Sequence, residues 1–239
     1  MTVEFSVVVP ACNEAENVEP LAREIEAAMR GRAYEMIFVD DGSTDDTAVN
    51  LLRLKASLPA LRVLRHSFRS GQSAAVASGV KLARGQWIAT LDGDGQNDPA
   101  DIPKLIAARD EHRGVHLVMG DRSASRKDTA YRRLQSRVAN GVRSSLLGDG
   151  TPDTGCGLKI FLRDAFLELP RFDHMHRFLP ALFQRQGARV ISVPVSHRER
   201  TRGQSKYGML NRLWVGIIDI LGVIWLRRRY KSGLLVRED

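Results

Sequence analysis

The chain has 239 residues, of which 43% are hydrophobic and 27% charged, and this composition indicates a globular protein with a sizeable core. Its formal net charge of +8 favours phosphorylated substrates, an anionic membrane surface or nucleic acid as partners. Its two cysteines, Cys12 and Cys156, exclude a disulfide framework and are typical of a reducing cytosol. The first residues lead straight into a predicted strand, so no secretory signal peptide is expected.

Predicted strands and helices alternate along the first half of the sequence. Short apolar runs predict strands at residues 4–9, 35–39, 61–64, 87–91 and 115–120. Helices are predicted between them, ending near Gly31, Leu54, Ala83 and Glu111. Repeated strand–helix units imply an α/β fold, with a mostly parallel sheet covered on both faces and right-handed crossovers.

Polar residues predict where these helices begin. We expect Asn13 to cap the first helix, with Glu16 as the reciprocal partner of a capping box. Ser43 or Thr44 is expected to cap the second helix. Three acids are assigned to helix starts, where they complement the helix dipole: Asp45, Asp46 and Asp98.

Two acidic clusters follow predicted strands directly. Asp40 and Asp41 end the second strand, and Asp92 and Asp94 end the fourth. Ligands of an open α/β sheet bind at the carboxyl ends of its strands, so the clusters should meet along one edge. Carboxylates, with the side-chain carbonyl of Gln96, suit a hard divalent cation that takes its remaining ligands from substrate phosphates. A solvated turn explains Asp-Gly-Asp equally well in isolation, and the second cluster favours a binding site.

The sequence lacks the glycine-rich phosphate loops of other nucleotide-binding folds. Neither G-x-G-x-x-G nor G-x-x-x-x-G-K-[ST] follows the first strand, which argues against dinucleotide-binding and P-loop proteins. A nucleotide here would be held by acids through its base and ribose, and by a metal through its diphosphate.

Four segments in the expected order resemble the family 2 glycosyltransferases. They are Val8-Val9-Pro10-Ala11-Cys12-Asn13-Glu14, Val39-Asp40-Asp41-Gly42-Ser43-Thr44-Asp45-Asp46-Thr47, Arg69-Ser70-Gly71-Gln72-Ser73-Ala74-Ala75 and Asp92-Gly93-Asp94-Gly95-Gln96-Asn97-Asp98-Pro99. The sequence is most similar to polyprenyl-phosphate sugar synthases of the dolichyl-phosphate mannose synthase type. The resemblance implies a GT-A catalytic domain over residues 1–207, in which Asp94 and Gln96 hold Mg²⁺ or Mn²⁺. The nucleotide-binding residues that it implies are Pro10, Asn13, Glu14, Asp40, Gln72 and Asp92.

The same resemblance assigns the acceptor side. In those enzymes an arginine after the fifth strand and one on the following helix hold a lipid phosphate, and these positions fall on Arg122 and Arg133. Arg133 and Arg137 lie four residues apart on a helix predicted over residues 131–147, where like charges are unfavourable unless an anion lies between them; a solvated basic face is the alternative. A loop over residues 200–207 matches R-x-G-x-S-K-[YF]. It adds Arg202, Ser205 and Lys206, and Asp153 lies on a loop that resembles the acceptor side.

These residues imply an inverting transfer from a UDP- or GDP-linked sugar to a polyprenyl phosphate such as undecaprenyl or dolichyl phosphate. The product would be a lipid-linked sugar donor for cell-envelope glycan or lipid A-type modification. Asp94, Arg122, Arg133 and Arg202 would carry catalysis. A phosphate monoester is mostly dianionic at neutral pH, so no general base is required.

Two other functions remain open at this stage. A family 2 transferase that extends a saccharide hydroxyl would need a catalytic acid near the acceptor, and Asp153 is the obvious candidate. A non-catalytic, membrane-associated nucleotide-sugar-binding protein is the second alternative. No nucleic-acid-binding pattern is visible, and a homo-oligomer is possible.

The C-terminal residues 208–239 predict an interfacial helix with a basic tail. Trp214 and Trp225 flank apolar runs too short to span a bilayer, and Asp219 lies in the middle. A basic run over residues 227–231 follows, as in helices that lie in a membrane interface. We therefore expect peripheral attachment at the cytoplasmic face of a membrane, the inner membrane in a bacterium. A terminal helix buried against the catalytic domain is the alternative.

Two histidines in the second half are candidates for bases or metal ligands. His174 and His176 have no acid or cysteine partner at a recognisable metal-binding spacing, so both are expected to be loop or core residues.

Overall fold

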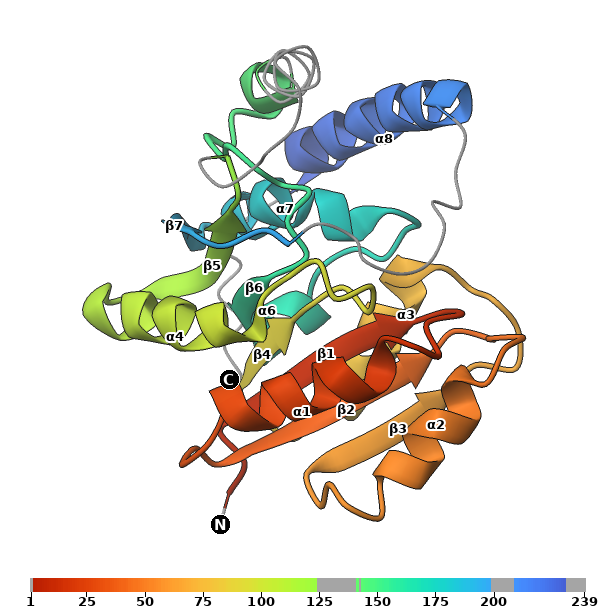
Figure 1. Ribbon diagram of the computed structural model, residues 1–239. Helices are drawn as coiled ribbons and strands as arrows, with labels where there is room; N and C mark the ends of the chain where they lie inside the picture. Colours follow the sequence, from red (N-terminus) through yellow and green to blue (C-terminus); the bar gives the residue numbers. More distant parts are fainter. Residues whose placement is uncertain (1, 124–140, 142, 199–208, 231–239) are drawn as a thin grey trace, which may run out of the picture.

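One mixed sheet organises the chain. The structure is a computed structural model that describes residues 2–123, 141, 143–198 and 209–230. Its strands follow the spatial order β3-β2-β1-β4-β6-β5-β7, as Figure 1 shows. They are β1 (Phe5–Ala11), β2 (Tyr34–Asp40), β3 (Leu61–Arg65), β4 (Trp87–Thr90), β5 (Val115–Asp121), β6 (Lys159–Leu162) and β7 (Arg189–Pro194).

The predicted parallel sheet is confirmed, with one antiparallel insertion. Strand β1 pairs in parallel with β2 and β4, β2 with β3, and β5 with β7. Strand β6 runs antiparallel between β4 and β5. Neither β6 nor β7 was predicted. β6 has only four residues and includes Lys159, and β7 alternates between half-buried and exposed positions without a buried one.

Helices cover both faces of the sheet. The helices are α1 (Val18–Ala28), α2 (Thr47–Leu54), α3 (Gln72–Leu82), α4 (Ile102–Glu111), α6 (Arg163–Leu167), α7 (Leu179–Arg185) and α8 (Met209–Arg229), with 3₁₀ turns η1 (Pro99–Asp101) and η2 (Met175–Arg177). One core cluster contains Ile25 of α1, Leu51 of α2 and Leu105 of α4. The other contains Val76 of α3 and Phe183 of α7. This two-faced α/β architecture is the one that the sequence predicts.

The predicted helix caps are wrong at two positions. Helix α1 begins at Val18, five residues after Asn13, and no side chain caps it. The Asn13 side chain instead accepts a hydrogen bond from the backbone N–H of Thr44 (2.8 Å). Helix α2 begins at Thr47, and it is the Asp45 carboxylate that accepts the Thr47 N–H (3.0 Å). Asn13 therefore joins the loop after β1 to the loop after β2. The two loops are adjacent because they follow neighbouring parallel strands.

The assignment of Asp98 to a helix start is confirmed. Its carboxylate accepts the backbone N–H of Ala100 at 2.9 Å, and η1 and α4 follow. The helix predicted over residues 131–147 lies largely outside the described residues, although residues 143–147 are helical.

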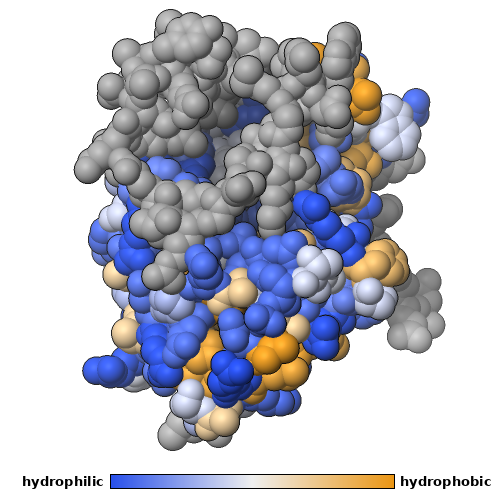
Figure 2. Space-filling model, turned by 45° about the vertical axis from the view of Figure 1, so that its right-hand side comes forward, coloured by the Kyte–Doolittle hydropathy of each residue, from blue (hydrophilic) through white to orange (hydrophobic). Residues whose placement is uncertain are grey.

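Helix α8 packs on the domain with one face only. Val223 is fully buried in the core cluster that contains α7, and Ile220 and Ile224 pack against it. On the opposite face Ile218 and Leu221 are 66% and 62% exposed. Figure 2 shows hydrophobic atoms at its upper right, on the side where α8 lies, and a second group lower on a mostly hydrophilic face. No helix among the described residues is long and apolar enough to cross a membrane.

Candidate active site

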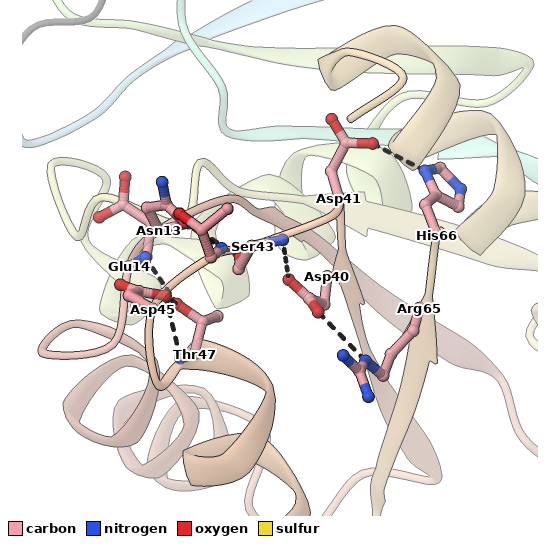
Figure 3. A network of polar contacts seen from close by, with 10 residues as sticks. Asn13, Glu14, Asp40, Asp41, Ser43, Asp45, Thr47, Arg65 and His66 are labelled. Atoms are coloured by element: carbon pink, nitrogen blue, oxygen red, sulfur yellow. Dashed lines mark hydrogen bonds and ion pairs between the residues drawn. The ribbon is translucent and has the colours of Figure 1, made fainter. Parts of the chain in front are cut away.

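The acid at the end of β2 is buried and held by its own loop. Asp40 has no exposed surface, and its carboxylate accepts the backbone N–H of Ser43 at 3.1 Å. The guanidinium of Arg65 on the neighbouring strand lies 3.3 Å from its other oxygen. Figure 3 shows these contacts side by side. Asp40 is thus fixed at the carboxyl edge of the sheet, where the sequence predicts it.

The loop after β1 is fastened to the loop after β2. The backbone N–H of Asn13 donates to Ser43 Oγ at 2.9 Å, and that of Glu14 donates to Thr47 Oγ1 at 2.8 Å. Asn13 adopts a left-handed backbone conformation with φ of 53°. The arrangement brings the predicted nucleotide-binding residues Asn13 and Glu14 to the loop that begins at Asp40, as Figure 3 shows.

Asp41 fixes the loop that leads into α3. Its carboxylate lies 2.7 Å from Nδ1 of His66 and accepts the backbone N–H groups of Ser70 and Gly71, each at 2.8 Å. Gly42 permits the close approach of this loop, since a Cβ there would lie 2.6 Å from the backbone nitrogen of Arg69. Gln72 is therefore held at the start of α3.

Gln72 connects α3 with the acids after β4. Its side-chain amide donates to Asp92 Oδ1 at 2.7 Å. Burial, followed by the charge of Asp94, raises the pKa of Asp92, while Lys159 and Arg122 oppose that shift. Asp94 accepts the backbone N–H of Gln96 at 3.1 Å. The two acids and Gln96 thus form one oxygen-rich turn at the end of β4.

A cavity of about 580 Å³ opens beside this turn. Its lining has three parts: residues of the donor side, cations and apolar side chains. The donor-side residues are Pro10, Gln72, Asp92 and Gln96, and the cations are Arg122, Arg143, Lys159 and Arg177. Phe178, Leu179 and Ile220 supply apolar surface. The cavity can therefore accept an anionic ligand that carries an apolar part.

Arg122 and Asp153 form a buried ion pair beside the cavity. Arg122 donates from Nε to Asp153 Oδ2 at 2.7 Å and from Nη2 to Oδ1 at 3.0 Å. Its backbone N–H also donates to Oδ2, at 3.2 Å. Burial alone would lower the pKa of Arg122, but the bonds and charge of Asp153 outweigh it and raise that pKa. The guanidinium is therefore charged and rigidly oriented.

The structure brings together part of the predicted site. Pro10, Gln72, Asp92, Gln96 and Arg122 line the cavity. The other predicted residues in the described part do not line it: Asn13, Glu14 and Asp40 lie in the joined loops, Asp94 is bonded to Gln96, and Asp153 is bonded to Arg122. The acceptor-phosphate candidates Arg133, Arg137, Arg202, Ser205 and Lys206 lie outside the described residues.

Four titratable residues of the cavity lining were not assigned to the site from the sequence: Lys159, Arg143, His176 and Arg177. Lys159 is buried on β6, and burial lowers its pKa. A lysine inside a short apolar run was a usable signal, because lysine is rarely buried without a role. Arg143 donates to Asp149 at 2.6 Å and to the Thr151 carbonyl at 2.8 Å. His176 and Arg177 belong to η2, a 3₁₀ turn that no sequence pattern predicted.

Cys156 is a buried, uncharged thiol. Burial raises its pKa, and both cysteines are free. A thiol whose pKa is raised is a weaker nucleophile at neutral pH, because less of it is ionised.

The fold and the acidic strand ends define a glycosyltransferase of the GT-A type. Crystal structures of glucosyl-3-phosphoglycerate synthase from Mycobacterium tuberculosis share this fold at a TM-score of 0.71 and 20% identity, over 94% of this chain and 80% of that chain. A complex of that enzyme with Mn²⁺, uridine diphosphate and phosphoglyceric acid superposes at a TM-score of 0.70, covering 96% of this chain and 80% of that one.

The chain belongs to glycosyl transferase family 2, whose family model matches residues 6–169. It is 39% identical, over 97% of its length and 69% of the relative, to dodecaprenyl-phosphate galacturonate synthase of Rhizobium johnstonii. It is 35% identical to undecaprenyl-phosphate 4-deoxy-4-formamido-L-arabinose transferase of Edwardsiella ictaluri, over 87% of this chain and 65% of that relative. The chain thus spans roughly two thirds of these relatives, and the resemblance to polyprenyl-phosphate sugar transferases is confirmed.

Proposed function

We propose that the protein transfers a sugar, with inversion, from a nucleotide sugar to a polyprenyl phosphate. The product would be a lipid-linked sugar donor for cell-envelope glycan or lipid A-type modification. The observation that carries this proposal is the cavity, where the Asp92 turn, four cations and an apolar wall meet. Relatives that are named for dodecaprenyl and undecaprenyl phosphate support the same acceptor class.

The surroundings of Asp153 favour a phosphate acceptor over a sugar hydroxyl. A hydroxyl must lose a proton to a base, whereas a phosphate monoester is already mostly ionised at neutral pH. Both carboxylate oxygens of Asp153 accept hydrogen bonds from Arg122. Asp153 is thus engaged in orienting a cation, and that cation is suited to an acceptor phosphate.

Positioning and electrostatics then account for the transfer. Pro10, Asn13, Glu14, Asp40, Gln72 and Asp92 would hold the nucleotide end of the donor. The acceptor phosphate would be held by Arg122 and, from the sequence, by Arg133, Arg137, Arg202, Ser205 and Lys206. These cations reduce the repulsion between acceptor and donor phosphates and align the acceptor oxygen behind the anomeric carbon. A single in-line displacement inverts that carbon.

The turn after β4 fits a divalent cation. Asp94 and Gln96 are hard oxygen donors, and Mg²⁺ or Mn²⁺ needs few protein ligands when substrate phosphates complete its shell. Burial, followed by the charge of Asp94, raises the pKa of Asp92, and a bound cation would offset the negative charge of this turn. No group of three His, Cys, Asp or Glu side chains in the described ranges could hold a metal by itself. The bound ion would neutralise the departing diphosphate.

The outer face of α8 is proposed to lie on a membrane surface. Ile218, Leu221 and Trp225 are exposed at helical spacing, and Arg227–Arg229 follow them. Apolar side chains beside cations match the interface of an anionic bilayer. We infer that residues 208–239 attach the catalytic domain of residues 1–207 peripherally, at the cytoplasmic face of the inner membrane in a bacterium.

One experiment tests the transfer directly. The protein is incubated with radiolabelled UDP- and GDP-sugars, Mg²⁺ or Mn²⁺ and undecaprenyl phosphate, and the lipid is then extracted. Label in an acid-labile lipid supports the proposal. Label that enters added oligosaccharide and never the lipid would assign the protein to the saccharide-extending transferases, and binding without any transfer would favour a nucleotide-sugar-binding protein.

A further inference from the structure

The His176 side chain is a neutral polar group of the cavity wall that the transfer mechanism leaves unused. Burial, followed by the charges of Lys159 and Arg177, lowers the pKa of His176 to about 3, so the imidazole is uncharged at neutral pH. It lines the same cavity as Gln72 and Asp92. The sequence-based expectation of a loop or core residue misses this position in the wall.

Ser73 fixes the orientation of the ring. Ser73 Oγ lies 2.7 Å from Nδ1 of His176 and accepts the backbone N–H of His176 at 3.3 Å. The direction of the bond between Ser73 Oγ and Nδ1 depends on the tautomer of the ring. When the Ser73 hydroxyl donates to Nδ1, the proton of the neutral ring is on Nε2, which is then a donor.

The first turn of α3 connects the His176 ring with the predicted nucleotide-binding residues. Gln72 donates to Asp92, and the next residue, Ser73, bonds to His176. No protein partner of Nε2 is seen among the described residues, and His176 lines the cavity. The donor N–H is therefore available to a ligand in the cavity.

The ligand group that suits this donor is uncharged. Arg122, Arg143, Lys159 and Arg177 line the same cavity and serve phosphate groups better than a neutral imidazole does. A sugar hydroxyl or ring oxygen accepts one neutral hydrogen bond. A site that supplies such a bond rejects analogues that lack the matching group, because its polar atom is then left unpaired.

We propose that His176 donates a hydrogen bond from Nε2 to an oxygen of the transferred sugar and so contributes to sugar selection. The proposal rests on the proposed function only in that the donor is a nucleotide sugar. It does not depend on which acceptor receives the sugar.

Binding measured without any lipid tests the proposal. Calorimetry compares the nucleotide sugar that the wild-type protein binds most tightly, from a panel of UDP- and GDP-sugars, with its free nucleoside diphosphate. His176→Asn keeps an acceptor for Ser73 but has no donor at the Nε2 position, and we expect about 3- to 10-fold weaker binding of the nucleotide sugar. Affinity for the nucleoside diphosphate should not change. His176→Gln, whose amide reaches the Nε2 position, should restore part of the loss.

His174→Asn is the matched control. His174 precedes η2, pairs with Asp219 at 3.3 Å and tolerates asparagine at its φ of 61°. Both affinities should stay at the wild-type values. Equal losses for nucleotide sugar and nucleoside diphosphate in His176→Asn would overturn the proposal, as would unchanged donor affinity with a raised KM for the lipid phosphate. Failure of lipid labelling alone bears on the acceptor and leaves this comparison intact.

Discussion

At the scale of single residues, the acceptor arginines and Asp153 have different roles for the two acceptor classes. With a phosphate acceptor, Asp153 only orients Arg122, whereas with a sugar hydroxyl it would be the base. For a phosphate acceptor we expect Arg202→Ala to lower kcat/KM about 10- to 100-fold, because charge-assisted bonds are worth about 1.5–3 kcal/mol. Asp153→Asn keeps one oxygen for Arg122 and should have a smaller effect on rate. Nucleotide-sugar affinity without acceptor should hardly change in Arg202→Ala. Steady-state kinetics with lipid phosphate measures both variants.

The opposite pattern would assign the protein to the saccharide-extending transferases. In that case Asp153→Asn would be inactive and Arg202→Ala near normal. Because Asp153 is buried and paired, thermal unfolding of both variants must accompany the kinetics, so that a loss of stability is not taken for a lost base.

Asp94 gives a second prediction at this scale. Asp94→Asn removes a charge from the turn after β4 without removing core volume, so transfer should fall at least about 100-fold while the thermal midpoint stays within a few degrees. EDTA should have the same effect reversibly. Asp110→Asn on the exposed side of α4 is the control. Full activity in excess chelator would contradict the metal assignment.

At the scale of elements, the sequence predicted strands where apolar runs are long and buried, and failed where other contacts decide. β1 and β2 are buried along almost their whole length, and their pattern predicted them. β6 is stabilised by its pairing with β4 on one side and β5 on the other. A strand of four residues has too short a pattern in the sequence to predict that pairing. Asn13 resembles a helix cap, but its partner Thr44 lies in a different loop, and local sequence carries no such information.

The same limit applies to the site. Acids at strand ends were predictable, because parallel strands place their carboxyl ends on one edge. Lys159 and His176 come from the second half of the chain, and the sheet order β4-β6-β5 and the bond from Ser73 to His176 are what place them there. Neither follows from spacing along the chain.

The buried carboxylate of Glu35 connects β2 with β1, β3 and the residues before β4, and its contribution to stability can be predicted. Its carboxylate on β2 accepts Ser6 Oγ at 2.7 Å, the backbone N–H of Arg84 at 2.6 Å and Arg62 Nη1 at 2.7 Å. Burial works to raise the pKa of Glu35, but these bonds outweigh it and lower the pKa below 4.5. A lowered pKa contributes stability above pH 4.5 that is lost as pH falls through the folded-state value.

Glu35→Gln should therefore destabilise the protein at pH 7 by about 1–3 kcal/mol. The difference from wild type should shrink as the pH falls from 4.5 through the lowered folded-state pKa, since the wild-type carboxylate becomes protonated over that range. Urea unfolding at pH 7 and at several values below 4.5 measures both. Glu111→Gln, at the exposed end of α4, is the control and should match wild type at each pH. A pH-independent difference would assign the effect to packing.

At the scale of the whole molecule, α8 carries the proposed contact of the protein with a membrane. One face of α8 is docked on the domain, and the other face is exposed and apolar; contact of that outer face with a membrane stays a prediction. Asp219 lies on the docked side, 3.3 Å from His174, so its charge does not oppose contact of the outer face with lipid. Deleting the helix would expose the core around Val223, and point substitutions on the outer face are the better test.

Ile218→Asp with Leu221→Asp should release the protein from vesicles that contain anionic lipid and leave its unfolding temperature unchanged, because both side chains are already exposed in the isolated protein. Added salt should weaken the binding of the wild-type protein by screening Arg227–Arg229. The control is Val49→Asp with Leu52→Asp on α2, which are also exposed apolar residues, at 51% and 53%. Co-sedimentation at several salt concentrations measures all three proteins. Undiminished sedimentation of the α8 variant, or equal loss in the α2 control, would place the membrane contact elsewhere on the molecule.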